Sequence, residues 1–222
     1  MSIEQKLVFY RSQMPENVRL VAVSKTKPNE MVLEAYDAGQ RIFGENKVQD
    51  LAAKQGLLPS DIQWHFIGHL QRNKVKLIAA FVDTIHAVDS LRLLKEIDKQ
   101  AKACNRTIKC LMQFHIAEEE SKFGLNYEEA VGILKSDEYS GMQNIQISGL
   151  MGMATYTNDI EKVRKEFKNL RSYFDSLRRT FFKDKTYFRE ISMGMSGDYK
   201  IAIEEGSTLI RIGTGIFGPR NY

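Results

Sequence analysis

Short apolar runs recur along the chain, and each is followed by a segment with helical periodicity. Several runs are nearly continuous in Val, Ile, Leu and Phe, which is typical of strands buried on both faces, as in a parallel sheet. Eight such runs occupy residues 20–25, 41–46, 63–69, 84–90, 108–116, 145–152, 187–194 and 208–214. Strands that alternate with helices predict repeated βα units.

The intervening segments carry helix signals. The longest helix is predicted over about residues 158–179, with Asn158 as its cap and Glu161 in the capping-box position. Its apolar positions advance by three and four residues and draw one stripe: Ile160, Val163, Phe167, Leu170, Phe174, Leu177 and Phe181. A short helix is expected over residues 196–205, and another over about residues 2–14, before the first strand.

Right-handed crossovers between parallel strands allow an open doubly wound sheet or a closed barrel. Eight units favour the barrel, whose usual length is about 250 residues and whose lower limit is about 200. The chain runs only a few residues beyond the eighth strand, so we expect the leading helix to take the vacant place in the outer ring. The predicted fold is α/β, a single (β/α)8 TIM barrel over residues 1–222 with an extra N-terminal helix.

Composition narrows the class of protein. Apolar residues make up 43% and charged residues 27% of the 222, which excludes a disordered chain. The net charge of +4 is far from that of a nucleic-acid-binding tail. Two cysteines, Cys104 and Cys110, cannot build a disulfide framework. With no signal peptide and no apolar run near 18 residues, we expect a soluble, cytoplasmic protein with no membrane contact, either a monomer or a weak homodimer.

In a barrel the functional face lies at the carboxyl ends of the strands, where Lys25 stands out. Lys25 ends an apolar run, so its amine would be drawn toward a dry interior. Desolvation lowers the pKa of an amine and makes it nucleophilic toward aldehydes, including sugar phosphates and pyridoxal phosphate. The alternative is a strand-end lysine that reaches solvent.

Two glycine-rich turns, residues 193–197 and 213–215, end consecutive strands at the place where barrels often bind phosphate. Ser196 would offer a hydroxyl and a helix start, and Gly213 and Thr214 would offer backbone donors. The glycines could instead simply form turns.

Arg211 lies two residues before Gly213 in the last predicted strand, so both share one face. A charge that points into a barrel needs a partner. We expect either a salt bridge to an inward carboxylate, such as Glu45 or Glu190, or a bond to a ring nitrogen or carboxylate of a ligand.

Seven motifs in order resemble the pyridoxal phosphate homeostasis proteins, which are related to the N-terminal barrel of alanine racemase. They cover nearly the whole chain: VAVSKTKP, FGENKVQ, WHFIGHLQRNK, EESKFGL, GLMGMAT, SMGMSGDYKIAIEEGST and IRIGTGIFG. The resemblance implies a barrel that holds pyridoxal 5′-phosphate as a Schiff base on Lys25. Ser196, Gly213 and Thr214 match its phosphate site, and Arg211 matches the arginine that faces the pyridine nitrogen.

Asn46 and His65 lie in motifs that line the pocket in that family. An arginine at the pyridine nitrogen keeps this nitrogen unprotonated and restrains carbanion chemistry. Racemases of this lineage add a tyrosine from a separate C-terminal domain, which the 222 residues do not contain. The resemblance therefore implies a role in vitamin B6 homeostasis, in which the protein carries, buffers or delivers the aldehyde, with PLP-dependent apoenzymes as candidate partners, rather than robust catalysis.

Alternatives are a low-activity amino-acid racemase, with Tyr156 or His65 as second base, and a lysine-dependent aldolase. Nucleic-acid binding by the basic helix around residues 162–185 is disfavoured, because acidic residues are interspersed and predict a solvated face. No metal site is expected, because His65 and His69 have the zinc spacing of a helix but fall in a predicted strand.

Overall fold

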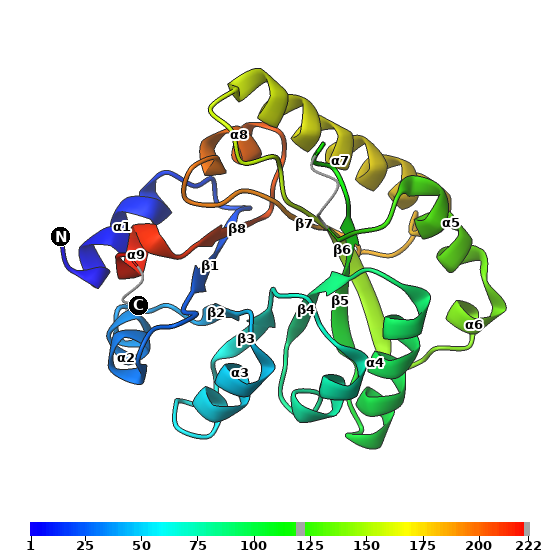
Figure 1. Cartoon of the computed structure of the whole chain (residues 1–222), viewed down its shortest axis with the longest axis horizontal. Coiled ribbons are helices and arrows are strands. Elements are labelled where there is room, and N and C mark those ends of the chain that lie inside the picture. The colour runs from blue at the N-terminus through cyan, green and yellow to red at the C-terminus, as the bar shows by residue number, and fades with distance from the viewer. Residues whose placement is uncertain (119–122, 220–222) are drawn as a thin grey trace.

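The structure, a computed structural model, describes residues 1–118 and 123–219 and closes into a barrel of eight parallel strands. Each strand pairs with the next, and β8 pairs with β1, so the sheet has no free edge (Figure 1). The strands are β1 (Arg19–Val23), β2 (Ile42–Glu45), β3 (Gln63–Phe66), β4 (Thr84–Val88), β5 (Ile108–Phe114), β6 (Ile145–Gly152), β7 (Glu190–Ser192) and β8 (Leu209–Ile212). The predicted (β/α)8 fold is confirmed.

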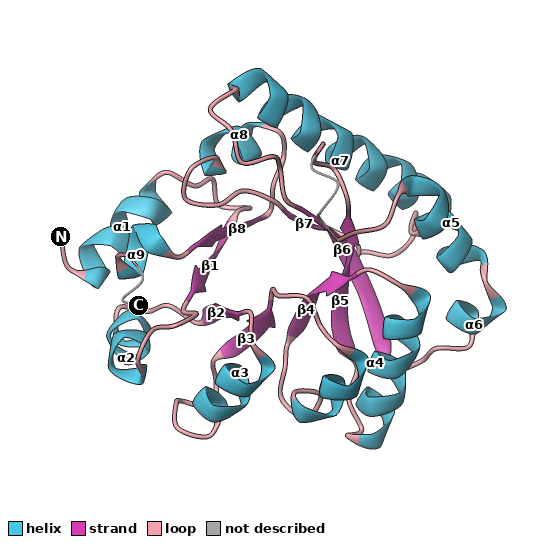
Figure 2. Ribbon diagram, viewed as in Figure 1, coloured by secondary structure: helices cyan, strands magenta, loops and turns pink. Residues whose placement is uncertain are grey.

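Helices form the outer layer around the ring of strands (Figure 2). They are α1 (Ile3–Ser12), α2 (Asn29–Asp37), α3 (Val48–Gln55), the 3₁₀ helix η1 (Arg72–Leu77), α4 (Leu91–Ala103), α5 (Tyr127–Lys135), α6 (Asp137–Ser140), α7 (Ile160–Phe181), α8 (Tyr199–Glu204) and α9 (Thr214–Phe217). Among the described residues, no helix combines the length and apolar content that crossing a membrane requires.

Three helix boundaries differ from the predicted ones. The cap of α7 is Asp159, whose carboxylate accepts from the Lys162 N–H at 3.0 Å, so the helix starts later than a cap at Asn158 predicts. The turn of α8 starts at Tyr199 and not at Ser196. A single turn, α9, follows β8 where no helix was expected.

The leading helix takes the place predicted for it beside the last strand. Helix α1 packs against α2 and α9, and Lys6 donates to the carbonyl of Ile216 at 3.1 Å. A side chain at Gly215 would collide with the hydroxyl of Tyr10, so glycine lets α9 lie directly on α1. The outer ring is thereby closed by the two ends of the described chain.

Apolar side chains fill both faces of the sheet. The larger cluster lies between the strands and the helices. A smaller, separate cluster fills the barrel interior and consists of Val21, Ala87, Leu111, Met151 and Leu209. Because side chains alternate along a strand, Leu209 of this inner cluster places Arg211 of β8 on the inner face as well.

Candidate functional site

The neighbouring strands β1 and β8 bring the predicted lysine and arginine to one side of the barrel. Val21 pairs with Arg211 in the parallel register, and Lys25 follows in the turn after β1, half-buried. Thr26 has a φ of 64°, an uncommon conformation for a β-branched residue, directly after Lys25. The chain therefore turns sharply directly after Lys25, at the carboxyl end of β1.

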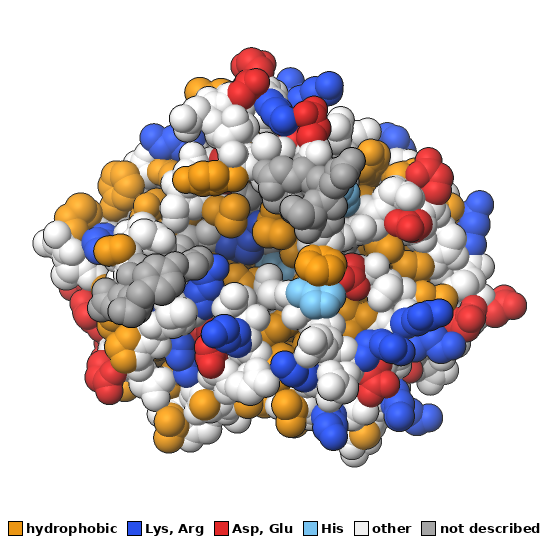
Figure 3. Space-filling view, in the orientation of Figure 1, with side chains coloured by type: hydrophobic (Ala, Val, Ile, Leu, Met, Phe, Trp, Pro, Cys, Tyr) orange, Lys and Arg blue, Asp and Glu red, His pale blue; other side chains and the backbone are white. Residues whose placement is uncertain are grey.

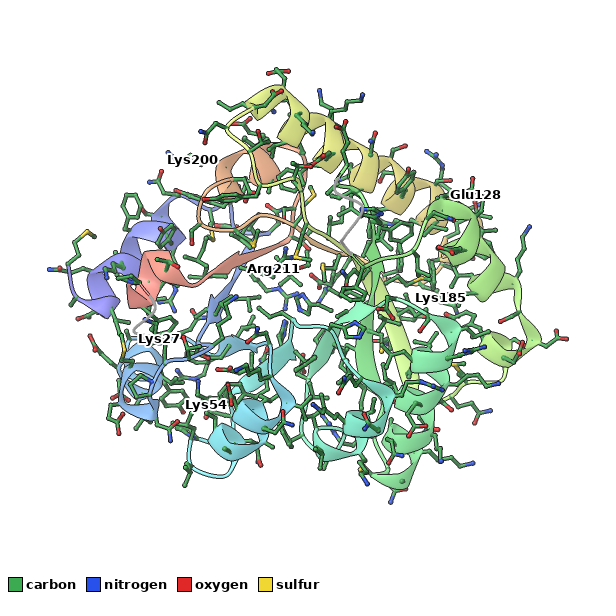
Figure 4. The ribbon with its side chains drawn as sticks, in the orientation of Figure 1. Lys27, Lys54, Glu128, Lys185, Lys200 and Arg211 are labelled. Atoms are coloured by element: carbon green, nitrogen blue, oxygen red, sulfur yellow. The ribbon has the colours of Figure 1, made fainter. Side chains whose placement is uncertain are left out.

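Arg211 lies inside the ring of strands (Figure 4) and is almost fully buried. One terminal nitrogen donates to the Ser192 hydroxyl, and the other donates to the Gly152 carbonyl at 3.1 Å. Burial lowers the pKa of Arg211 to about 10, an effect that the charge of Asp198 opposes. The guanidinium thus stays charged at neutral pH.

The expected salt bridge from Arg211 to Glu45 or Glu190 is wrong. Glu45 points to the outer face of the sheet, where it accepts from Lys54 of α3 at 2.6 Å. Glu190 pairs with Arg19, also at 2.6 Å. Alternation along β2 explains the first difference, because Glu45 shares a face with Phe43 of the outer core.

Ser196, Gly213 and Thr214 lie on the turns that follow β7 and β8. Gly194 opens the first turn with a φ of 93°, and a Cβ there would lie 2.5 Å from the Cβ of Ala202, so only glycine fits. Within the described chain, the Ser196 hydroxyl and the backbone N–H of Thr214 form no hydrogen bond. These groups are donors that an anionic ligand could engage.

Asn46 and His65 occupy different levels of the barrel. Asn46 follows β2 at the carboxyl rim, half-buried. His65 is buried within β3, and its Nε2 faces Asp83, which directly precedes β4, at 3.5 Å. The imidazole of His65 is therefore turned toward the amino-terminal end, away from the rim that carries Lys25.

Three polar residues near Arg211 were not singled out from the sequence: Ser192, His86 and Asp83. Ser192 accepts from Arg211 and is also 3.0 Å from Nδ1 of His86. His86 falls within an otherwise apolar run, which was the only signal in the sequence. A shift of register between Ile85 and Val88 breaks the alternation of β4 and turns both His86 and Ala87 inward.

Side chains outside the barrel interior concern two alternatives, nucleic-acid binding by α7 and metal binding by the histidines. On α7, Arg164 pairs with Glu204 and Glu205, both at 2.6 Å, as a solvated face predicts. His69 stacks on Phe123 at the carboxyl rim, with ring centroids 4.3 Å apart, and Figure 3 shows apolar and histidine side chains gathered near the centre of this face. Within residues 1–118 and 123–219, no group of three or more His, Cys, Asp or Glu is arranged to hold a metal.

The candidate site thus combines a half-buried lysine in the turn after β1, two glycine-containing turns after β7 and β8, and a buried guanidinium that stays charged at neutral pH. This donor set fits a small phosphorylated aldehyde with a basic ring nitrogen, because each of its polar groups would meet a complementary partner. Pyridoxal phosphate has all three groups.

Comparisons with known proteins agree on one family. The model of the alanine racemase N-terminal domain matches residues 2–221. The pyridoxal phosphate homeostasis protein of Vibrio alginolyticus is 37% identical over 236 residues, which cover 100% of this chain and 99% of that protein. The Homo sapiens protein of the same name is 39% identical, over 92% of this chain and 77% of its own length.

Solved structures give the same result. PipY of Synechococcus elongatus without PLP superposes with a TM-score of 0.91 at 37% identity, over 98% of this chain and 100% of that one. The same protein with PLP bound gives a TM-score of 0.88, also at 37% identity. An alanine racemase of Clostridium difficile, at 13% identity and a TM-score of 0.77, shares the fold over 98% of this chain and 59% of its own. The chain belongs to the pyridoxal phosphate homeostasis protein family, within the alanine racemase N-terminal domain fold.

Proposed function

We propose that this protein binds pyridoxal 5′-phosphate on Lys25 and serves vitamin B6 homeostasis by holding the reactive aldehyde for PLP-dependent apoenzymes. The observation that supports the proposal is the pairing of β1 with β8, because Lys25 follows β1 by two residues and the buried Arg211 lies in β8. Pyridoxal phosphate supplies an aldehyde that condenses with a lysine amine and releases water.

Each polar group of this ligand has a candidate partner in the chain. The phosphate would be held by the Ser196 hydroxyl and by the backbone around Gly213 and Thr214, which follow the neighbouring strands β7 and β8. The guanidinium of Arg211 would donate to the ring nitrogen and keep it unprotonated, because an arginine does not give up its proton near neutral pH. Asn46 at the rim would contact the ring edge.

Borohydride reduction followed by peptide mapping tests the attachment site. We expect a pyridoxyl adduct on Lys25 and loss of the visible absorbance band in Lys25→Ala. Lys27→Ala is a matched control, because Lys27 lies in the same loop but donates to the carbonyl of Pro219 at 2.6 Å. An adduct that maps only to another lysine contradicts the proposal. A purified protein without any visible band favours a lysine-dependent aldolase.

A racemase of low activity is the second candidate. His65 is a poor second base, because one ring nitrogen contacts Asp83 and the other lies 2.8 Å from His86, deep in the barrel. Tyr156 is 97% exposed in the loop after β6, so a catalytic role would require it to move over the rim. Exchange of the α-proton of alanine or serine in heavy water separates the two functions. Turnover at enzyme-like rates contradicts a purely homeostatic role.

A further inference from the structure

A chain of polar side chains connects Arg211 to Asp83 through the barrel interior, and all of its members except the partly exposed Asp83 are buried. The Ser192 hydroxyl joins the guanidinium to Nδ1 of His86 at 3.0 Å. Nε2 of His86 lies 2.8 Å from Nδ1 of His65, and Nε2 of His65 lies 3.5 Å from Asp83. The five residues come from four strands and the loop before β4, so the chain exists only in the closed barrel.

The chemistry of the two ends limits how the hydrogen bonds between them can run. A guanidinium only donates, so Ser192 accepts from it and keeps its own proton available for His86. An ionised carboxylate only accepts, so His65 carries a proton on Nε2. With both imidazoles neutral, Nε2 of His86 must donate to Nδ1 of His65, and both rings are then Nε2–H tautomers.

The charges that face the histidine pair support this neutral state. Burial lowers the pKa of His65, opposed by Asp83, and Arg19 and Lys109 lower it further. Burial, His65 and Arg211 hold the pKa of His86 well below its usual value.

The Asp83 end of the chain stays ionised. Although burial acts against ionisation, hydrogen bonds from His65 and Thr84 and the charge of Lys109 keep the pKa of Asp83 well below normal. Its carboxylate meets Lys109 at 3.2 Å and lines a cavity of about 80 Å³ at the amino-terminal end of the barrel. These five residues form a relay, which runs from Arg211 through Ser192, His86 and His65 to Asp83. Its negatively charged end, Asp83, lies at this cavity.

Among the described residues, no carboxylate accepts a hydrogen bond from Arg211, and the relay provides its countercharge at a distance. Two of its five N–H donors are used by Ser192 and Gly152. We propose that Asp83, His65 and His86 are positioning residues that act through Ser192, aim the remaining donors of Arg211 at a ligand ring nitrogen and stabilise its charge. This inference rests on the proposed function, because the ring nitrogen belongs to the proposed cofactor.

The first test uses the protein without cofactor. In ¹⁵N-resolved NMR of the histidine rings, His65 and His86 should both show the Nε2–H tautomer, with slowly exchanging ring protons. Ser192→Ala should change the His86 signals. It should also make the guanidinium group of Arg211 more mobile, which its N–H signals report. Exposed His69 is the internal control. A charged or Nδ1-protonated His86 at neutral pH, or Arg211 signals unchanged in Ser192→Ala, overturns the relay.

The second test uses the cofactor-loaded protein and changes the far end of the relay. Asp83→Asn keeps the shape but removes the charge, so the absorbance maximum of the bound chromophore should shift and release should quicken by roughly tenfold, the effect of one charge-assisted hydrogen bond. Asp175→Asn is the matched control, since its carboxylate pairs with Arg171 on the outside of α7. An identical spectrum and release rate in the two variants overturns the positioning role.

These tests separate the two proposals. If wild-type protein forms no chromophore, the proposed function fails, while the NMR signals of the ligand-free protein still decide whether the relay holds Arg211. If the chromophore forms on Lys25 but does not respond to Asp83→Asn, only the relay fails.

Discussion

Two buried polar clusters lie on opposite faces of the same sheet, and they are built differently. On the outer face, Glu45 accepts from both Ser24 and Lys54 at 2.6 Å, and Lys54 also donates to the Ser24 carbonyl at 2.7 Å. On the inner face, the hydrogen-bond partners of Arg211 within residues 1–118 and 123–219 are the neutral Ser192 hydroxyl and Gly152 carbonyl. Figure 4 shows Lys54 beside α3 and Arg211 inside the ring.

The difference indicates which cluster builds the fold and which serves a ligand. The outer cluster is a closed ion pair that ties α3 to the residue before Lys25. The inner cluster holds a buried cation by hydrogen bonds to neutral groups alone, and the uncompensated desolvation of that charge opposes folding. Stability and binding should therefore separate when the two clusters are changed one at a time.

Lys54→Met should have the largest effect on stability. It leaves the Glu45 carboxylate buried without its cation, and one oxygen of that carboxylate already has no hydrogen-bond partner among the described residues. We expect the free energy of unfolding to fall by about 3–5 kcal/mol, measured by urea denaturation. The double variant Lys54→Met/Glu45→Leu should recover much of the loss, and a double variant as unstable as the single one contradicts this account.

Arg211→Met should change the free energy of unfolding little and the affinity for the ligand strongly, which is the opposite of the result expected for Lys54→Met. Removal of a buried cation that contacts no carboxylate relieves a desolvation penalty, so we expect a change in unfolding free energy within about 2 kcal/mol in either direction. Pyridoxal phosphate affinity, followed by absorbance titration, should fall by at least tenfold, because the variant lacks the donor of the proposed charge-assisted hydrogen bond to the ring. If stability falls as far as in Lys54→Met while affinity is kept, the comparison of the two clusters is wrong.

Acid should destabilise the protein through the inner cluster. The pKa values of His65 and His86 are lowered in the folded state, so the unfolded chain takes up protons first as the pH drops. The contribution of the two neutral histidines to the free energy of unfolding is fully present above the pKa of an unfolded-state histidine, about 6.5. Below that pH it declines, by up to about 1.4 kcal/mol per pH unit for each histidine. Urea denaturation at several pH values measures this slope.

A histidine variant sharpens the pH prediction. His86→Gln should roughly halve the dependence of stability on pH between about 6.5 and 5, because one of two depressed groups is removed. His69→Gln is the control, since His69 is exposed at the rim. Equal slopes in the two variants count against a buried neutral pair.

The smallest effect should come from the surface. Arg171 and Asp175 form an ion pair one helical turn apart on α7, and both side chains are more than a third exposed. We expect Asp175→Asn to change the unfolding free energy by no more than about 0.5 kcal/mol. If Asp175→Asn lowers the free energy of unfolding as much as Lys54→Met does, burial does not explain the difference between the Arg171–Asp175 and Lys54–Glu45 pairs.

Sequence patterns predicted the parts of the site that depend on local order. The alternation around Gly213 placed Arg211 on the inner face, and the apolar run before Lys25 placed the amine at the end of a strand. Predicted partners failed where they depended on strands far apart in the chain. Glu45 was assigned to Arg211, but its own alternation along β2 directs it to Lys54 on the other face of the sheet.

The sequence by itself determined the number of strands, their alternation with helices and the inward direction of Arg211, because all of these follow from periodicities of a few residues. Only the tertiary structure decided what Arg211 touches. The irregularity in β4 turns His86 inward, and barrel closure brings it to Ser192, 106 residues away. Such contacts depend on how distant strands are staggered around the barrel, which no local pattern records.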